Sequence, residues 1–314
     1  MLLQCEWKWP RYTLDRRVLM GKRRPNLFLI GAMKAGTTSL HAYLRSHPQI
    51  FIPQKGSEFF ARETVWLRGE DWYLNLFAAA QSESVIGEKS TVYSKIPLCP
   101  SVPERIAKFN PEARFIYIMR DPVERTISQY WFHMQFCGER REMLTAIRED
   151  PQYTDTSNYA MQLAPYVELF GSDRIATLTL EELSKDKTNI MRQLFTWLGV
   201  NASFAPPNLK QRENITPDKI VLFKNRRLNC VVRSPIIRAL KARMPSQVIS
   251  LANRILGRHE YLDRSSVSLD KVIEFLEPIQ KEQVARLEEM LGRSFPEWTT
   301  LYGNLTPAGP TNTA

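Results

Sequence analysis

The feature that most constrains this chain is a short apolar run that leads through a glycine-bounded turn into hydroxyl residues. The run covers residues 26–30, the turn lies between Gly31 and Gly36, and Thr37 and Thr38 follow it. A strand, a turn and a helix N-terminus in this order form an anion site, because the unpaired helix donors and the helix dipole face the ligand. Glycines let the backbone come close to that ligand. The stretch therefore predicts a phosphate-binding loop.

This loop differs from the nucleotide-triphosphate motif G-x-x-x-x-G-K-[ST]. Gly31 and Gly36 keep the glycine spacing, but Thr37 stands where that motif has its lysine, and Lys34 lies inside the turn. A kinase or ATPase needs the lysine on the outer phosphates and a hydroxyl on Mg²⁺. We therefore interpret the loop as a cradle for a phosphate of a different nucleotide.

A second anion motif follows the apolar run at residues 115–119. It begins Arg120-Asp121-Pro122 and reaches Ser128. Asp121 is a good N-cap and proline suits the first helical position, so Arg120 is expected at the end of a strand and Ser128 about two turns into a helix. An arginine fork and a hydroxyl suit a terminal phosphate.

Both motifs resemble those of the sulfotransferases that use 3′-phosphoadenosine 5′-phosphosulfate (PAPS), in particular the bacterial members and the domains that modify heparan sulfate. Lys34–Leu40 is similar to the family's 5′-phosphosulfate loop, and R-D-P-x-x-R-x-x-S-x-Y at residues 120–130 is similar to its 3′-phosphate motif. The resemblance is strong over residues 27–128, fair to residue 200 and weak beyond.

The resemblance implies transfer of a sulfuryl group from PAPS to an acceptor hydroxyl or amine, with release of 3′,5′-ADP and no metal. The residues implied in binding the donor are Lys34, Ala35, Gly36, Thr37, Thr38, Ser39, Arg120 and Ser128. Lys34 would stabilise charge on the bridging oxygen as the S–O bond breaks. Lys89, in a Gly-Glu-Lys-Ser segment similar to one in the family, is expected to assist at the sulfuryl oxygens.

The general base is open, because Gly56 stands where the family's glutamate is expected. Glu58 could take the acceptor proton from a shifted loop, and His133 could do so from the helix that carries Ser128. A third alternative is a protein with little activity on a demanding acceptor. Glu58 is the first candidate and His133 the second.

Apolar strands alternate with amphipathic helices along the chain, which predicts an α/β fold with a P-loop-like parallel sheet flanked by helices and a helical C-terminal part. We expect one domain over residues 25–302, an irregular arm over 1–24 and a loose tail over 303–314. In the last helix we expect Pro278 near the start.

Charge and cysteine content limit the binding partners and the cellular location that we expect. Residues 219–258 hold ten Lys/Arg and no Asp or Glu, which accounts for the net charge of +10. We expect this segment to form basic helices on the acceptor side, with peripheral membrane contact as one possibility and a solvated surface as the other. The four cysteines are far apart and form no C-x-x-C pair. A cytoplasmic, bacterial protein that binds no nucleic acid is the simplest expectation.

Two rival classes remain at this point. A P-loop nucleotide kinase would need the lysine that Thr37 displaces. A nucleotide-binding module without turnover stays open because of Gly56. A sugar, a lipid or a small molecule with a hydroxyl group would each serve as the acceptor.

Overall fold

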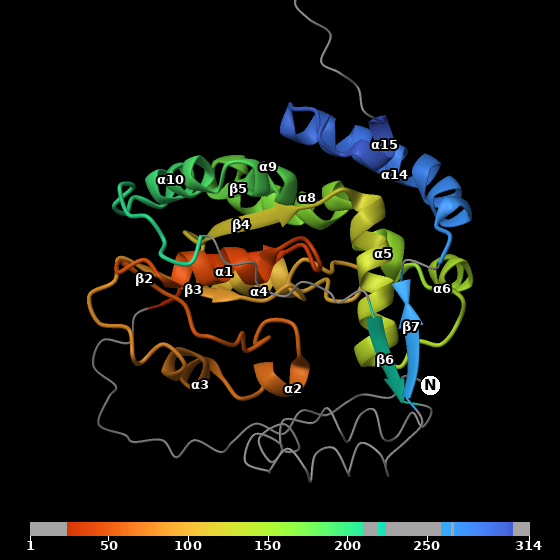
Figure 1. The fold of residues 1–314 in the computed structure, drawn as a ribbon. Helices are drawn as coiled ribbons and strands as arrows, with labels where there is room; N and C mark the ends of the chain where they lie inside the picture. Colours follow the sequence, from red (N-terminus) through yellow and green to blue (C-terminus); the bar gives the residue numbers. More distant parts are fainter. Residues whose placement is uncertain (1–23, 210–218, 224–258, 265–266, 304–314) are drawn as a thin grey trace, which may run out of the picture.

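The computed structural model describes residues 24–209, 219–223, 259–264 and 267–303. At its centre is a parallel sheet of five strands in the order β2-β3-β1-β4-β5 (Figure 1). The strands are β1 (Leu27–Gly31), β2 (Ile50–Phe51), β3 (Val85–Lys89), β4 (Arg114–Met119) and β5 (Ile175–Thr179). The α/β fold with a parallel sheet, predicted from the alternation of strands and helices, is confirmed. β1 is central and pairs with β3 and β4.

The two faces of the sheet are apolar because successive side chains of a strand point to opposite sides. In β1, Phe28 and Ile30 enter one buried cluster, whereas Leu27 and Leu29 enter the other. Both faces of a parallel sheet must be covered, so helices pack on each side. The result is a three-layer arrangement in which β1 is shielded from solvent on both faces.

The face that contains Leu27 is covered by three helices, α1 (Thr37–Arg45), α9 (Leu180–Lys185) and α10 (Lys187–Leu198). α1 ends at Arg45, and His47 is buried just beyond it. The His47 Nε2 lies 3.0 Å from the Asn201 carbonyl oxygen, and the ring packs against Phe195 and Phe204. His47 is therefore a structural residue at the end of this helix.

The opposite face is covered by a larger set of helices. They are α3 (Glu70–Asn75), α4 (Val102–Phe109), α8 (Tyr159–Phe170) and α14 (Asp270–Leu291), and α2 (Glu63–Trp66) lies at their edge. An aromatic group that includes Phe28, Phe60 and Tyr73 fills the space beneath them. This face holds the larger of the two cores.

The helix after β4 starts as the sequence predicts. α5 (Pro122–Phe132) is capped by Asp121, whose carboxylate accepts the N–H groups of Val123 and Glu124. A π-helical turn, η2 (His133–Cys137), continues α5, and α6 (Met143–Glu149) and α7 (Gln152–Asp155) follow. Ser128 and His133 were expected on the same α-helix. In the structure α5 ends at Phe132, and His133 is the first residue of the π-helical turn that directly continues it.

Two expectations for the C-terminal part are also wrong. Residues 219–223 form a strand, β6 (Lys219–Phe223), which pairs antiparallel with β7 (His259–Asp263) beside α5 (Figure 1). Lys219–Phe223 contains the β-branched residues Ile220 and Val221 next to two further apolar residues, a composition that favours a strand. Pro278 lies inside α14 rather than near its start, because Val272 and Leu276 extend the buried stripe toward the N-terminus.

A short helix, α15 (Thr299–Tyr302), returns to the start of α5. The Thr300 hydroxyl donates to Asp121 Oδ1 at 2.5 Å, and the Thr300 N–H donates to Oδ2 at 3.0 Å. One carboxylate therefore caps α5 and anchors α15.

Several expectations lie outside the described residues. These are the arm over residues 1–23, the helices and basic surface over 224–258, and the tail over 304–314. Among the helices that the structure describes, none is both long enough and apolar enough to cross a membrane.

Candidate active site

The turn between β1 and α1 is built to accept an anion. Gly36 is the N-cap of α1 with φ 89°, no side chain caps the helix, and its first turn has no acidic residue. The N–H groups in the first turn of a helix have no partner within the helix. They therefore point out of the helix end, where an anion would also meet the positive end of the helix dipole. The predicted phosphate-binding loop has the required backbone.

Two close approaches explain the glycines of this turn. A Cβ on Gly31 would lie 2.5 Å from Tyr117 Cε2 and 2.4 Å from Ser94 Oγ. A Cβ on Gly36 would lie 2.7 Å from Leu180, and its left-handed φ disfavours any side chain. The turn is thus packed against its neighbours through the bare backbone.

Lys34 is held within the turn at φ 69°, a region that non-glycine residues seldom adopt. Its ammonium lies over the ring of Phe132, 5.1 Å from the centroid. Burial lowers the pKa of Lys34, and the nearby guanidinium groups of Arg120, Arg264 and Arg125 lower it further. A crowded group of cations such as this favours an anion between them.

Lys89 joins the turn from the end of the neighbouring strand β3. Its Nζ donates a hydrogen bond to Thr38 Oγ1 at 3.1 Å. Burial lowers the pKa of Lys89. The structure therefore brings Lys89 to the same turn that holds Lys34, and Thr38 reaches both the helix end and this lysine.

Arg120 directly follows β4, and Ser128 lies on α5. The Arg120 guanidinium donates to Glu124 Oε2 from Nε at 3.1 Å and from Nη2 at 2.5 Å. The Tyr159 hydroxyl donates to the Arg120 carbonyl oxygen at 2.6 Å and fixes the backbone. Ser128 is buried in α5. Because the charge of Arg120 lowers the pKa of Lys34, the two cations face a common region.

The segment that should hold the glutamate is closed against β3. A Cβ on Gly56 would lie 2.0 Å from the Lys89 carbonyl oxygen, so this backbone has no room for a side chain. The next residue, Ser57, donates both its N–H and its hydroxyl to Glu88 Oε1, each at 2.6 Å. At Gly56 the backbone is therefore packed directly against the end of β3, and Ser57 is tied to Glu88.

Glu58 turns away from this contact. Its φ is 57°, and its carboxylate forms an ion pair with Arg62 one helical turn later. Glu58 is near enough to raise the pKa of Lys95 and of the Cys99 thiol. The Glu58 carboxylate is therefore held by Arg62 and is one of the charges that act on Lys95 and Cys99.

Glu88 is a buried carboxylate that the sequence left without a role. Besides Ser57, its donors are the hydroxyls of Tyr73 at 2.8 Å and Tyr93 at 2.9 Å. Burial raises its pKa, and the hydrogen bonds from these donors oppose that effect. Because it is 2% exposed, it does not reach an acceptor. Through its bonds to Ser57, Glu88 holds the Gly56 segment against the end of β3.

His133 begins η2 and is fixed by one ring nitrogen. Its Nδ1 lies 3.1 Å from the Tyr153 hydroxyl. Burial lowers the pKa of His133 to about 4, and the charge of Lys95 lowers it further. The imidazole is therefore neutral at pH 7, which leaves a proton-accepting nitrogen but a weak base.

A family model for sulfotransferases matches residues 67–204. The fold is similar to that of a crystal structure of a sulfotransferase from Alicyclobacillus acidocaldarius, with a TM-score of 0.62 and 25% identity over 88% of this chain and 99% of that one. Residues 67–204 are therefore similar to the sulfotransferase family. Lys89, Arg120, Ser128 and His133 lie within the matched residues, and the donor loop lies before them.

Named relatives are similar over shorter parts of their length. The membrane-associated sulfotransferase kil1 of Dictyostelium discoideum is 36% identical over 115 residues, which is 36% of this chain and 24% of that protein. Heparan sulfate glucosamine 3-O-sulfotransferase 3B1 of Mus musculus is 28% identical over 191 residues, 57% of this chain and 47% of that protein. The match spans less than half of each relative.

The structure brings Arg264 to the same group of cations as Lys34 and Arg120. It follows β7, lies near enough to lower the pKa of Lys34, and stacks 5.5 Å from the centroid of Trp131. No local motif marks Arg264, because only the pairing of β6 with β7 brings it beside α5.

The structure also gives a place to Arg125, the second arginine of the Arg-Asp-Pro motif. It is 0% exposed and donates to Gln129 Oε1 at 2.6 Å and to the carbonyl oxygens of Tyr153 at 2.7 Å and Met33 at 3.4 Å. Burial lowers its pKa to about 10. Arg125 thus ties the donor loop to α5 and to α7. In the sequence, the signal that could have pointed to this role is a charged residue on the buried face of the predicted helix.

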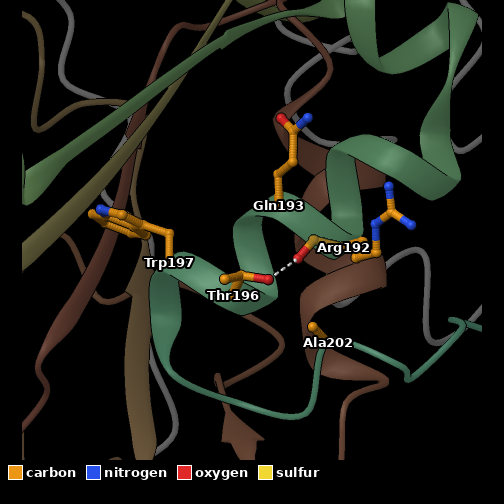
Figure 2. Close-up of a pocket in the computed structure, with 5 residues that line it drawn as sticks. All are labelled: Arg192, Gln193, Thr196, Trp197 and Ala202. Atoms are coloured by element: carbon orange, nitrogen blue, oxygen red, sulfur yellow. Dashed lines mark hydrogen bonds between the residues drawn. The ribbon is translucent and has the colours of Figure 1, made fainter.

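A hollow of about 360 Å³ lies elsewhere, on α10 and the turn after it. Figure 2 shows the residues that line it, Arg192, Gln193, Thr196, Trp197 and Ala202. The Trp197 indole N–H donates to the Asp173 carbonyl oxygen, and Arg114 lies over its ring. Arg114 begins β4 and Asp173 precedes β5, so the hollow is at the amino ends of the strands. The donor loop is at the opposite edge.

Proposed function

We propose that this chain transfers a sulfuryl group from PAPS to an acceptor hydroxyl or amine and releases 3′,5′-ADP. The observation that carries the proposal is the meeting of Lys34, Lys89 and Arg120 at a helix N-terminus that no side chain caps. The match of residues 67–204 to a sulfotransferase family model and the similarity to a sulfotransferase structure support it. A Walker lysine is replaced by Thr37, which disfavours a nucleotide kinase.

The residues present fit the donor. The uncapped first turn of α1 suits the 5′-phosphate, since Gly36 leaves its N–H groups unobstructed. Arg120 suits the 3′-phosphate because a guanidinium can form two parallel hydrogen bonds to it, and Ser128 adds a hydroxyl. Glu124 now holds the Arg120 guanidinium, and we expect it to be displaced in part when a phosphate binds.

Each reacting atom has a residue assigned to it. The acceptor oxygen or nitrogen forms a bond to sulfur, and the bond from sulfur to the 5′-phosphate oxygen breaks with its electron pair on that oxygen. Lys34 stabilises the charge that develops there, and Lys89 stabilises the sulfuryl oxygens. Both roles need cations in a site shielded from water, which agrees with the lowered pKa of each lysine.

The acceptor proton goes to Glu58 or to His133. Glu58 is paired with Arg62, and His133 is neutral at pH 7 because burial keeps its pKa at about 4. We expect Glu58→Gln to lose turnover while it keeps affinity for 3′,5′-ADP, and His133→Ala to lose less. Single-turnover rates and calorimetry measure the two quantities. Loss of turnover in His133→Ala alone would move the base to the histidine, and full turnover in both variants would reject both.

Calorimetric binding of 3′,5′-ADP and of Mg-ATP tests the donor assignment. We expect tight binding of 3′,5′-ADP, poor binding of ATP, and a loss of about tenfold to a hundredfold in Arg120→Ala, because a charge-assisted bond to phosphate is removed. Arg286→Ala is the matched control, since it also removes an arginine paired with a glutamate four residues away. Preference for ATP would reject the proposal.

A nucleotide-binding protein without turnover is the second candidate, and the closed backbone at Gly56 favours it. Release of 3′,5′-ADP that depends on added acceptor separates the two. The cytoplasmic location and bacterial source stay predictions, and so does the membrane contact through residues 219–258.

A further inference from the structure

The first turn of α9 contacts both halves of the candidate donor site. α9 begins directly after β5, and the Arg-Asp-Pro motif begins directly after β4, whose last residue pairs with the last residue of β5. Leu180 and Glu181, the first two residues of α9, therefore lie beside that motif at one edge of the sheet. Leu180 Cδ1 would lie 2.7 Å from a Cβ on Gly36, so this side chain packs directly against the backbone at the N-cap of α1.

Glu181 contacts the other half, where it holds the peptide group that joins Arg120 to Asp121. Its Oε1 accepts the Asp121 N–H at 3.0 Å. The Tyr159 hydroxyl donates to the Arg120 carbonyl oxygen at 2.6 Å, which is the other polar atom of the same peptide group. Side chains from α9 and α8 therefore satisfy both atoms of this one peptide group. Together they fix the direction in which Arg120 leaves the end of β4.

Glu181 uses only one of its two oxygens in this way. Its Oε2 is buried and accepts no hydrogen bond from the residues that the structure describes. Burial raises the pKa of Glu181 to about 7, because a charged carboxylate is unfavourable in such a place. A buried carboxyl that is only half satisfied destabilises a fold. What Glu181 does to the Arg120 peptide therefore explains its place better than a contribution to stability does.

The side chain of Arg120 depends on a fixed backbone, because it has to change partners. Its guanidinium is paired with Glu124 one helical turn later, and a 3′-phosphate would compete for the same donors. Two parallel hydrogen bonds to a phosphate form only when the plane of the guanidinium faces it. With the peptide held from two sides, Arg120 can release Glu124 and still face the incoming phosphate.

We propose that Glu181 is a positioning residue of the donor site, which holds the Arg120 peptide so that the guanidinium selects nucleotides with a 3′-phosphate. The inference rests on the proposed function and names a residue that sets its donor preference. Glu181 itself does not touch the phosphate. Without its carboxyl, the N–H of Asp121, a residue that is 2% exposed, has lost its acceptor, and the peptide must turn to find another.

Calorimetric binding of 3′,5′-ADP and of 5′-AMP measures this preference, since the two nucleotides differ only in the 3′-phosphate. We expect the wild-type chain to bind 3′,5′-ADP about a hundredfold more tightly, and Glu181→Ala to lower this ratio about tenfold while its affinity for 5′-AMP stays within about twofold. Glu181→Gln should keep the ratio within about threefold, because the amide oxygen still accepts the Asp121 N–H.

Glu297→Ala is the matched control. It removes another carboxylate at the start of α9, one whose Oε1 accepts the Thr179 hydroxyl at 2.9 Å, where Thr179 is the N-cap of the helix. This change loosens the same helix end and leaves the Arg120 peptide held. The ratio of the two affinities should therefore equal that of the wild type.

The outcomes separate this inference from the proposed function. An unchanged ratio in Glu181→Ala, or an equal loss of affinity for both nucleotides, overturns the inference and assigns Glu181 a structural role. If Glu181→Ala does not fold, Tyr159→Phe tests the other bond of the same peptide group, and an unchanged ratio there overturns the inference as well. Equal binding of the two nucleotides by the wild-type chain rejects the proposed function itself.

Discussion

The segments that follow β1 and β2 leave the same edge of the parallel sheet, yet their backbones are used in opposite ways. After β1, Gly36 keeps the N-terminus of α1 uncapped, so backbone donors are open to a ligand. After β2, Gly56 lies against the Lys89 carbonyl oxygen and Ser57 is bonded to Glu88, so the backbone is closed. Under the proposed function, the donor would be bound mainly through main-chain groups, and the acceptor through side chains around the closed segment.

The largest expected effect comes from removing the charge of Lys34 in the open segment after β1. We expect Lys34→Met to lower the single-turnover rate by about a hundredfold to a thousandfold, the range seen when one group that stabilises a developing charge is removed. Affinity for 3′,5′-ADP should change far less, because the backbone donors remain. Lys185→Met, an exposed lysine on α9, should keep the wild-type rate. A similar loss in affinity and in rate would mean that Lys34 only binds.

The closed segment is tested by adding one carbon. Gly56→Ala places a methyl group 2.0 Å from a carbonyl oxygen, and we expect a loss of about 3 kcal/mol in the free energy of unfolding, the upper end for overpacking. Urea unfolding measures it. Gly199→Ala, at a left-handed residue with open space around it, should lose about 1–2 kcal/mol and keep turnover. Faster turnover in a folded Gly56→Glu would show that the segment opens to accept a glutamate.

The smallest expected effect is the contribution of Glu181 to the pH dependence of the free energy of unfolding. Burial raises the pKa of Glu181 to about 7, and its Oε1 accepts the Asp121 N–H at 3.0 Å. The unfolded chain loses this proton near pH 4.5, whereas the folded chain keeps it until about pH 7. The free energy of unfolding should therefore fall as pH rises between those values and then level off. Glu181→Gln should flatten that fall, and the exposed Glu168→Gln should not. If the free energy of unfolding of Glu181→Gln fell with rising pH as steeply as that of the wild type, the raised pKa of Glu181 would be contradicted.

The donor half of the site could be predicted because its signals are local. A strand, a turn with Gly31 and Gly36 and a helix are contiguous in the sequence, and the Arg-Asp-Pro motif caps its own helix. Pairing of parallel strands then brings Lys34, Lys89 and Arg120 to one edge of the sheet. Their assigned roles stay predictions until they are measured.

The acceptor half could not be predicted because its contacts join distant segments. Arg264 comes near Lys34 only through the β6–β7 pairing, and the Tyr153 hydroxyl that lies 3.1 Å from His133 Nδ1 comes from α7. The π-helical turn at His133 has no simple sequence signature, and Pro278 lies inside α14 because tertiary packing extends that helix toward its N-terminus. The periodicity of apolar residues predicts one helix or strand at a time, whereas these features depend on contacts between two elements.

The bonds from Thr300 to Asp121 have a consequence for how the chain matures. The two residues are 179 positions apart, so the cap of α5 gains its last partner only after almost the whole domain has been synthesised. Contacts of such long range form slowly, since a large loop must close first. A nascent chain that has reached α10 already contains every strand of the parallel sheet. It must nevertheless wait for α15 before the Arg120 end of the donor site is locked.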